Sequence, residues 1–194
     1  MTEMEKMLAG EYYDPNDQEL LALRTKAHLL SQRYNRIPET EAAERAEVLK
    51  ELIPDAGEGV YLQGPLQFDY GCNTTIGKNS YANFNLTVLD VCPVRIGANV
   101  FMGPNVSLLT PMHPMRWQER NVYQREDGVW TDREYGKPIT IGDNCWLGGN
   151  VTVCAGVTIG EGCVIGAGSV VVRDIPPNSL AVGNPCRVIR RIEE

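Results

Sequence analysis

The chain has 194 residues, of which 43% are hydrophobic and 22% are charged, and this balance is typical of a globular protein. Its net charge of -7 at pH 7 argues against nucleic acid as a partner, because phosphate contacts need clustered Lys and Arg side chains. No apolar run approaches the roughly 18 residues that indicate a membrane span, and the acidic start lacks the basic and apolar stretches of a signal peptide. We therefore expect a cytoplasmic protein that binds neither nucleic acid nor a membrane.

The N-terminal region, residues 1–57, has a helical pattern that the rest of the chain lacks. Apolar residues recur every three or four positions over 17–34, which indicates an amphipathic helix. The candidate N-caps of this helix are Asp14, Asn16 and Asp17. Thr40 is expected to cap a second helix, which ends near Pro54. We expect the two helices to form a hairpin that packs on the remainder of the protein, since an isolated pair would be only marginally stable.

From residue 58 to 194 a six-residue repeat replaces the helical period. In the C-terminal half the repeated apolar positions are Ile141, Leu147, Val153, Ile159, Ile165 and Val171. The same spacing occurs earlier at Ile96, Met102 and Leu108, and where it slips, as at 68–76, we expect a small insertion at a corner. A hexapeptide period is the signature of a parallel β-helix, in which each repeat supplies one short strand and one corner. Three repeats in each coil would make a three-sided prism, so residues 58–194 are predicted to form one mainly β domain.

Residues 110–138 interrupt the repeat completely. They are polar, with four aromatic side chains, and a long insertion in a regular solenoid is uncommon unless it has a function. His113 stands at its start between Pro111 and Pro114, which restrict the backbone on both sides. A histidine held in this way on a rigid scaffold suits a general base, since histidine titrates near neutral pH. The other histidine, His28, falls in the first predicted helix and is expected to be an ordinary surface residue.

The six cysteines indicate neither disulfides nor a zinc site. None forms a C-x-x-C pair, and a zinc centre built from three histidines is excluded because only one histidine is available for it. Cys145 and Cys163 are eighteen residues apart, so a three-repeat coil places one above the other in an inward column. We therefore expect reduced cysteines that fill space in the core, and no metal requirement. The asparagine-rich segment 79–85 has two interpretations that stay open: a run of corner residues, or polar groups for a hydroxylated ligand.

Seven motifs spread over nearly the whole chain resemble those of the maltose/galactoside O-acetyltransferase family of hexapeptide-repeat acyltransferases. They lie at 69–71, 82–85, 89–93, 113–114, 136–142, 146–149 and 183–189. The run LDVCP at 89–93 is closer to the maltose-type branch than to the galactoside-type branch. The resemblance implies a homotrimer of single-stranded left-handed parallel β-helices, each with an N-terminal α-helical hairpin. It also implies that acetyl-CoA and a small sugar acceptor meet between subunits.

The same resemblance implies roles for individual residues. His113 matches the catalytic base, and Asn83 matches a residue near it that binds the acceptor. Asp14 and Asp69 match two other residues that contact the acceptor, and Asp90 lies at or beside a third such position. The alignment around Asp14 leaves Asp17 as an alternative. The positions that match acetyl-CoA contacts are Gly149, Ala167, Val172, Arg173, Arg187 and Arg190.

Two of the acetyl-CoA positions depart from the galactoside-type branch. That branch has Ser where this chain has Gly149, and Thr-Lys where it has Val172 and Arg173. The first change keeps the backbone N–H at position 149 available for a contact. The second change removes the hydroxyl group, and with it any hydroxyl contact, at position 172.

We therefore expect an acetyl-CoA-dependent O-acetyltransferase in which a sugar hydroxyl attacks the thioester directly, with His113 as general base. The Gly149 N–H is the candidate donor to the tetrahedral oxyanion. The C-terminal arginines are expected to meet the phosphates or the adenine of acetyl-CoA. Two alternatives stay open: an acyltransferase whose acceptor is an antibiotic or an amino-acid hydroxyl, and a catalytically silent β-helix that acts as a scaffold. His113 and the C-terminal arginines weigh against the scaffold.

Overall fold

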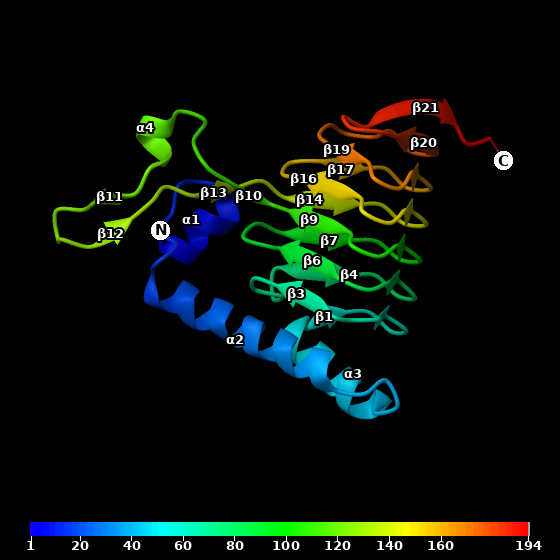
Figure 1. Cartoon of the computed structure of the whole chain (residues 1–194), viewed down its shortest axis with the longest axis horizontal. Helices are drawn as coiled ribbons and strands as arrows, with labels where there is room; N and C mark the ends of the chain where they lie inside the picture. The colour runs from blue at the N-terminus through cyan, green and yellow to red at the C-terminus, as the bar shows by residue number, and fades with distance from the viewer. Residues whose placement is uncertain (194) are drawn as a thin grey trace.

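The computed structural model of the protein describes residues 1–193. The helices in this part of the chain are α1 (Glu3–Ala9), α2 (Gln18–Arg36), α3 (Ala42–Leu52) and α4 (Trp117–Arg120). Figure 1 shows α2 and α3 at one end of a stack of short strands, while α4 belongs to a segment that extends away from the stack. No helix within 1–193 has the length and apolar character needed to cross a membrane.

The strands of the stack form three sheets, which are the faces of a prism. The first face contains β1 (Asp55–Ala56), β4 (Thr74–Ile76), β7 (Val94–Ile96), β14 (Ile139–Ile141) and β17 (Thr158–Ile159). The second contains β2 (Tyr61–Leu62), β5 (Tyr81–Ala82), β8 (Phe101–Met102), β15 (Trp146–Leu147), β18 (Val164–Ile165), β20 (Ser179–Val182) and β21 (Arg187–Arg191). The third contains β3 (Leu66–Phe68), β6 (Leu86–Leu89), β9 (Ser107–Leu109), β16 (Thr152–Cys154) and β19 (Val170–Val171). The chain visits the faces in turn and its strands pair in parallel, except that β21 runs antiparallel to β20, so the predicted β-helix is confirmed.

The register between neighbouring coils follows from the six-residue repeat. Ile141 pairs with Ile159, eighteen residues later, so three repeats complete one coil. Ile76 pairs with Ile96, twenty residues later, so the early coils contain the small insertions that the slipped spacing predicts. The inward residues are almost fully buried and form one continuous core. Cys145 and Cys163, which the spacing predicted to lie in one inward column, are both buried.

Asparagine residues make the tight corners between the faces. Asn85, Asn105 and Asn150 have φ of 62°, 60° and 59°, a left-handed conformation that Asn adopts more readily than most non-glycine residues. Their side chains form a ladder, in which Asn85 Nδ2 donates to Asn105 Oδ1 at 2.9 Å and Asn105 Nδ2 donates to Asn150 Oδ1 at 3.0 Å. Asn79 also has a positive φ, whereas Asn83 does not. The asparagine-rich segment therefore consists partly of corner residues, and Asn83 is the exception in it.

The N-terminal region contains the predicted hairpin of α2 and α3, together with a further helix, α1. Asp17 is the N-cap of α2, where its side chain accepts from two backbone N–H groups of the first turn. The prediction that Thr40 caps α3 is wrong, because the chain is still in a turn there and the helix begins only after Glu41. The unpredicted α1 starts with a capping box of Thr2 and Glu5, a signal that the sequence does contain.

The hairpin closes one end of the prism through a buried arginine. Arg45 donates to Tyr34 Oη at 3.1 Å and to the carbonyl oxygens of Leu62 and Gln63 at 3.0 and 2.8 Å. These carbonyl groups belong to the first coil, where no preceding strand of the second face is available to pair with them. The apolar faces of α2 and α3 continue the core of the coils without a gap. The β-helix itself begins directly after α3, since β1 already pairs with β4.

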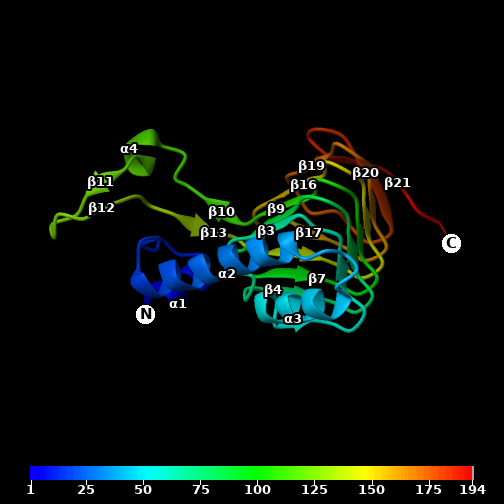
Figure 2. The same cartoon turned by 60° about the horizontal axis from the view of Figure 1, so that its bottom comes forward.

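The insertion at 110–138, which we call the arm, has its own secondary structure. β10 (Pro111–Met112) pairs antiparallel with β13 (Tyr135–Gly136), and β11 (Tyr123–Gln124) pairs antiparallel with β12 (Trp130–Thr131). Figure 2 shows the arm leaving the prism on the side opposite to β20 and β21. The base of the arm packs on the N-terminal segment, where Tyr13 N donates to Glu134 O at 3.1 Å and the Tyr12 and Tyr135 rings meet edge-on at 5.2 Å.

Candidate active site

His113 lies at the base of the arm, in line with the strand pair β10 and β13. The register of this pair places His113 opposite Glu134, with Asp132 diagonal to it on the same side. The Nδ1 atom of His113 is 3.1 Å from the carbonyl oxygen of Arg133 and 3.6 Å from a carboxylate oxygen of Asp132. The side chain of His113 is 43% exposed, so a substrate can reach it.

The contact with Arg133 fixes the tautomer of His113. A carbonyl oxygen can only accept a hydrogen bond, so we assign the ring proton to Nδ1. The Nε2 atom then keeps its lone pair and can accept a proton from a bound hydroxyl group. His113 thus has the orientation and the free nitrogen that a general base requires.

Glu134 connects the base of the arm to the N-terminal segment. Tyr13 Oη donates to Glu134 Oε1 at 2.6 Å. Burial raises the pKa of Glu134, against the opposing effects of the Tyr13 bond and of the nearby His113. Burial and the neighbouring Glu134 also raise the pKa of Tyr13, so its phenol keeps its proton and remains the donor.

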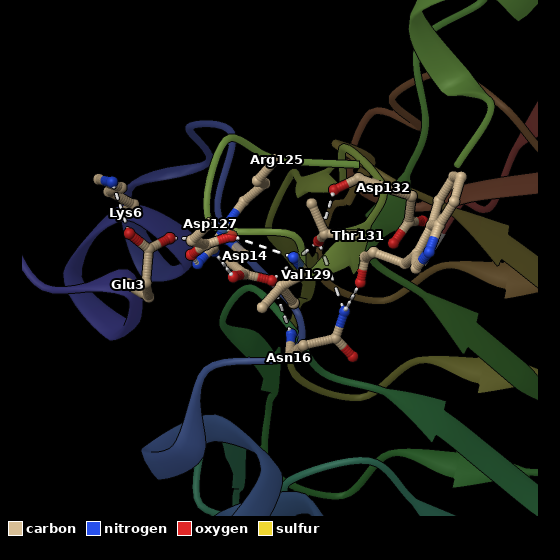
Figure 3. A network of polar contacts seen from close by, with 10 residues as sticks. Glu3, Lys6, Asp14, Asn16, Arg125, Asp127, Val129, Thr131 and Asp132 are labelled. Atoms are coloured by element: carbon tan, nitrogen blue, oxygen red, sulfur yellow. Dashed lines mark hydrogen bonds and ion pairs between the residues drawn. The ribbon is translucent and has the colours of Figure 1, made fainter. Parts of the chain in front are cut away.

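Asp14 lies between the N-terminal segment and the arm, at the centre of the polar network that Figure 3 shows. One carboxylate oxygen accepts from Thr131 Oγ1 at 2.9 Å and from Asn16 N at 3.0 Å, and the other pairs with Arg125. A pocket of about 220 Å³ adjoins this network. The sequence left Asp14 and Asp17 as alternatives for an acceptor contact. Asp17 caps α2, whereas Asp14 faces the arm.

Asp69 lies directly after β3 and faces α2. A ring nitrogen of His28 is 3.5 Å from one of its carboxylate oxygens, so His28 lies on the helix surface as predicted but also contacts a candidate site residue. Burial raises the pKa of Asp69, whereas His28 and Arg24, one helical turn apart on α2, act to lower it. The charge of Asp69 in turn helps to raise the pKa of Glu134.

Asp90 is fully buried, with 0% of its surface exposed. Its carboxylate accepts from Tyr70 N and from Thr74 Oγ1, both at 2.8 Å. Burial raises its pKa, although these hydrogen bonds act in the opposite direction. Since both oxygens are bonded inside the protein, the structure gives Asp90 a supporting position behind the corner that carries Asp69.

Asn83 lies in another part of the molecule, on the edge between the second and third faces. We call it the Asn83 edge, and its corresponding positions in successive coils are Asn83, Gly103, Gly148 and Gly166. Asn83 Oδ1 accepts from Phe84 N at 2.7 Å, which leaves the Nδ2 group to donate to a ligand. The arm leaves the prism after the third face and returns at the first. Within one chain the structure therefore does not bring Asn83 and His113 together.

A row of outward aromatic side chains on the second face runs beside the Asn83 edge. Tyr61, Tyr81, Phe101 and Trp146 are register partners in successive coils. Phe101 is 53% exposed and Trp146 is 57% exposed. Together with Asn83, the last three line a pocket of about 420 Å³. The sequence contains a signal for this row, since each aromatic residue directly precedes an inward residue and must face outward.

The positions expected to contact acetyl-CoA lie on the surface of the last coils. Gly149 and Ala167 follow directly after the positions of the Asn83 edge, and Gly168 N donates to Gly149 O at 2.9 Å. The bond from Cys186 N to Val170 O, at 2.9 Å, holds the start of β21 against β19. The remaining positions, on β21 or directly after β19, are Val172, Arg173, Arg187 and Arg190.

The carboxylates that surround His113 were not predicted from the sequence. Asp132 and Glu134 alternate along an extended segment, so their side chains point to the same side. This spacing is visible in the sequence, but only the pairing of β13 with β10 brings the two carboxylates close to His113. Tyr13, which bonds to Glu134, gives no comparable signal.

Comparison with known proteins agrees with the resemblance of the motifs. Residues 6–57 match the maltose acetyltransferase hexapeptide capping motif, and residues 138–173 match the bacterial transferase hexapeptide (six repeats). The crystal structure of a maltose O-acetyltransferase from Clostridium difficile 630 is similar to 100% of this chain and 99% of its own, with 45% identity and a TM-score of 0.92. A hexapeptide-repeat acetyltransferase from Vibrio cholerae O1 biovar eltor, solved with acetyl-CoA, matches over 100% of both chains, with 35% identity and a TM-score of 0.87.

A curated relative extends the comparison to the galactoside branch. Galactoside O-acetyltransferase of Escherichia coli (strain K12) is 40% identical over 190 residues, which cover 98% of this chain and 89% of that protein. These matches include the helical region and the arm as well as the repeats. The chain therefore belongs to the hexapeptide-repeat acetyltransferase family, among proteins similar to maltose and galactoside O-acetyltransferases.

Proposed function

We propose that the protein transfers the acetyl group of acetyl-CoA to a hydroxyl group of a small sugar. The observation that carries the proposal is the orientation of His113, whose Nδ1 is held by Arg133 O while the exposed ring keeps Nε2 free. Similarity to maltose and galactoside O-acetyltransferases supports a sugar as the acceptor. The acetyl-CoA complex of the Vibrio cholerae relative supports acetyl-CoA as the donor.

His113 acts in both halves of the proposed reaction. Its Nε2 atom accepts the proton of the sugar hydroxyl while the oxygen attacks the carbonyl carbon of the thioester. The oxyanion of the tetrahedral intermediate receives a hydrogen bond from the backbone N–H of Gly149. When the intermediate collapses, the C–S bond breaks, and the leaving sulfur of CoA takes from the His113 imidazolium the proton that came from the sugar hydroxyl.

The acceptor is held by polar groups from three parts of the chain. Asp14 and Asp69 supply carboxylates, which can accept hydrogen bonds from neighbouring hydroxyl groups of a sugar. Asn83 supplies an amide donor, and Asp90 keeps the corner of Asp69 in place. The arginines that follow β19 or lie on β21 are proposed to bind the phosphate groups of acetyl-CoA.

We propose that the active site forms between the chains of a homotrimer. His113 and Asn83 lie on different edges of one prism, so a site that contains both needs a second copy of the chain. The exposed aromatic row of the second face offers an apolar surface for that contact. The six free cysteines fit a reducing compartment, which supports the cytoplasm as the place of the reaction.

Release of free thiol from acetyl-CoA tests the proposed function. The assay compares maltose, glucose and a galactoside with chloramphenicol and serine, which represent antibiotic and amino-acid hydroxyl groups. We expect a sugar to stimulate thiol release most strongly, with one acetyl ester formed for each thiol. Stimulation by chloramphenicol or serine alone would assign the enzyme to another acceptor class. No stimulation by any acceptor would favour the scaffold.

A further inference from the structure

The base of the arm gathers three side chains that metal ions commonly use as ligands. His113, Asp132 and Glu134 each offer one ligand atom, and these atoms lie within 4.8 Å of one another. All three side chains project from the same side of the extended pair that β10 and β13 begin. Tyr13 holds Glu134 in place through its bond to Oε1, and this bond leaves the other carboxylate oxygen available. Such a bond to a carboxylate is the kind of outer support that natural metal sites have.

The charges around this cluster favour a cation. Within residues 1–193, neither Asp132 nor Glu134 forms an ion pair with a lysine or arginine, and the one basic partner is His113 itself. The charge of Asp69 also acts to raise the pKa of Glu134. Asp132 and Glu134 are both half-buried. A cation between the carboxylates would offset their mutual repulsion.

We propose that His113, Asp132 and Glu134 bind a divalent transition-metal ion such as Zn²⁺, and that this ion reversibly inhibits the enzyme. One imidazole nitrogen and two carboxylate oxygens form a donor set that zinc accepts, with a further position left for water. Zinc–ligand distances of about 2.0–2.2 Å place neighbouring ligand atoms roughly 3–4 Å apart. The three side chains therefore need to close only slightly around the ion.

The inhibition rests on the proposed role of His113 as general base. An ion on Nδ1 would replace the hydrogen bond to Arg133, and the neutral ring would then carry its proton on Nε2. An ion on Nε2 would occupy the lone pair directly. In either case Nε2 has no lone pair for the proton of the acceptor hydroxyl, so the reaction stops until the ion dissociates.

Calorimetric titration of the full-length protein with Zn²⁺ alone tests the site independently of activity. We expect one ion for each chain, and a loss of affinity of at least about 10-fold in Asp132→Asn and in His113→Gln. Tyr13→Phe should weaken binding by roughly 10-fold, because Glu134 loses its support. The matched control is Glu126→Gln, which removes one charge from an exposed position in the arm and should bind Zn²⁺ like the wild type.

Two further measurements distinguish binding at this cluster from binding at a cysteine. Co²⁺ used in place of Zn²⁺ should give a spectrum without a sulfur-to-metal charge-transfer band, whereas such a band would show binding at a cysteine, such as the exposed Cys72, and overturn the proposal. Acetyl transfer by the wild type should fall as Zn²⁺ occupies the site and recover when a chelator is added. Wild-type affinity in Asp132→Asn, or full activity at saturating Zn²⁺, would contradict the inference. If the protein transfers acetyl groups to no acceptor, the proposed function fails, and the titration still decides whether the metal site exists.

Discussion

In the coils, each inward residue packs between its counterparts in the coils on either side, whereas the arm is held to the N-terminal segment by a few hydrogen bonds, by an ion pair and by one edge-on pair of aromatic rings. Leu147, for example, has Met102 and Ile165 as register partners and is completely buried. The arm depends on specific contacts such as the bond of Tyr13 to Glu134. Together with the proposed role of His113, this difference predicts a division of labour, in which the repeat supplies stability and the arm supplies the reacting group.

The largest effect is expected from a change in the arm that leaves the coils untouched. His113→Gln removes the proton acceptor, so we expect the turnover number to fall by roughly 10²–10⁴-fold. The melting temperature and the affinity for acetyl-CoA should stay near their wild-type values, because His113 is exposed and the donor is proposed to lie on the prism. Steady-state thiol release and calorimetry measure both quantities. Turnover within a few-fold of the wild type would remove His113 from the mechanism.

A substitution in the core of the coils should lower stability and leave activity almost unchanged, the reverse of the effect of His113→Gln. Leu147→Ala leaves a cavity in the central column and should lower the free energy of unfolding by about 2–5 kcal/mol. The activity of the molecules that remain folded should change little. Trp130→Ala in the arm is the matched control, since Trp130 is 61% exposed and its loss should change stability by less than about 0.5 kcal/mol. Urea unfolding of both variants gives the comparison, and equal losses would refute the division of labour.

Two substitutions at one corner residue can distinguish the cost of backbone strain from the cost of lost hydrogen bonds. Asn105 has φ of 60° and takes part in the asparagine ladder. Asn105→Ala should lower the free energy of unfolding by about 1–2 kcal/mol, because alanine is strained in the left-handed region. Asn105→Gly loses the same ladder bonds without that strain and should therefore be the more stable of the two. Urea unfolding that ranks the glycine variant below the alanine variant would contradict this role of strain at the corners.

The smallest effect concerns the pH dependence of stability through Glu134. Burial raises its pKa in the folded state above the unfolded value, so its contribution to stability is present at low pH and is lost as the pH rises through the folded-state pKa. Glu134→Gln does not titrate, and its amide oxygen can still accept from Tyr13. The variant should therefore gain stability relative to the wild type between about pH 4 and pH 7. Urea unfolding at several pH values should show this widening difference, and parallel curves for the two proteins would argue against it.

The parts of the fold that could be predicted from the sequence are those governed by local repetition. The six-residue period predicted the prism, the coil length and the inward column of Cys145 and Cys163, because every repeat places its residues by the same rule. The start of α3 was misplaced because a turn outweighed the capping preference of Thr40. The fold of the arm could not be predicted, since its key bond joins residues that are 121 positions apart in the chain.

The candidate site shows the same limit. His113 stood out in the sequence because it opens the interruption, and the resemblance supplied Asp14 and Asp69. Asp132 and Glu134 lie beside His113 only because β13 pairs with β10 in this register, and no local sequence pattern encodes that register. Asp90 has a conspicuous motif around it, yet burial makes it a support for its neighbours.

Co-assembly of two inactive variants tests most directly whether the arm of one chain and the Asn83 edge of another form the active site. Chains with His113→Gln keep an intact Asn83 edge, and chains with Asn83→Ala keep an intact arm. When both are expressed together with different tags and mixed assemblies are purified through both tags, about one third of the sites in a trimer should combine the two intact residues. We expect thiol release to recover to about that fraction of the wild-type rate. Mixed assemblies that remain as inactive as either parent, although they contain both chains, would contradict a site shared between copies.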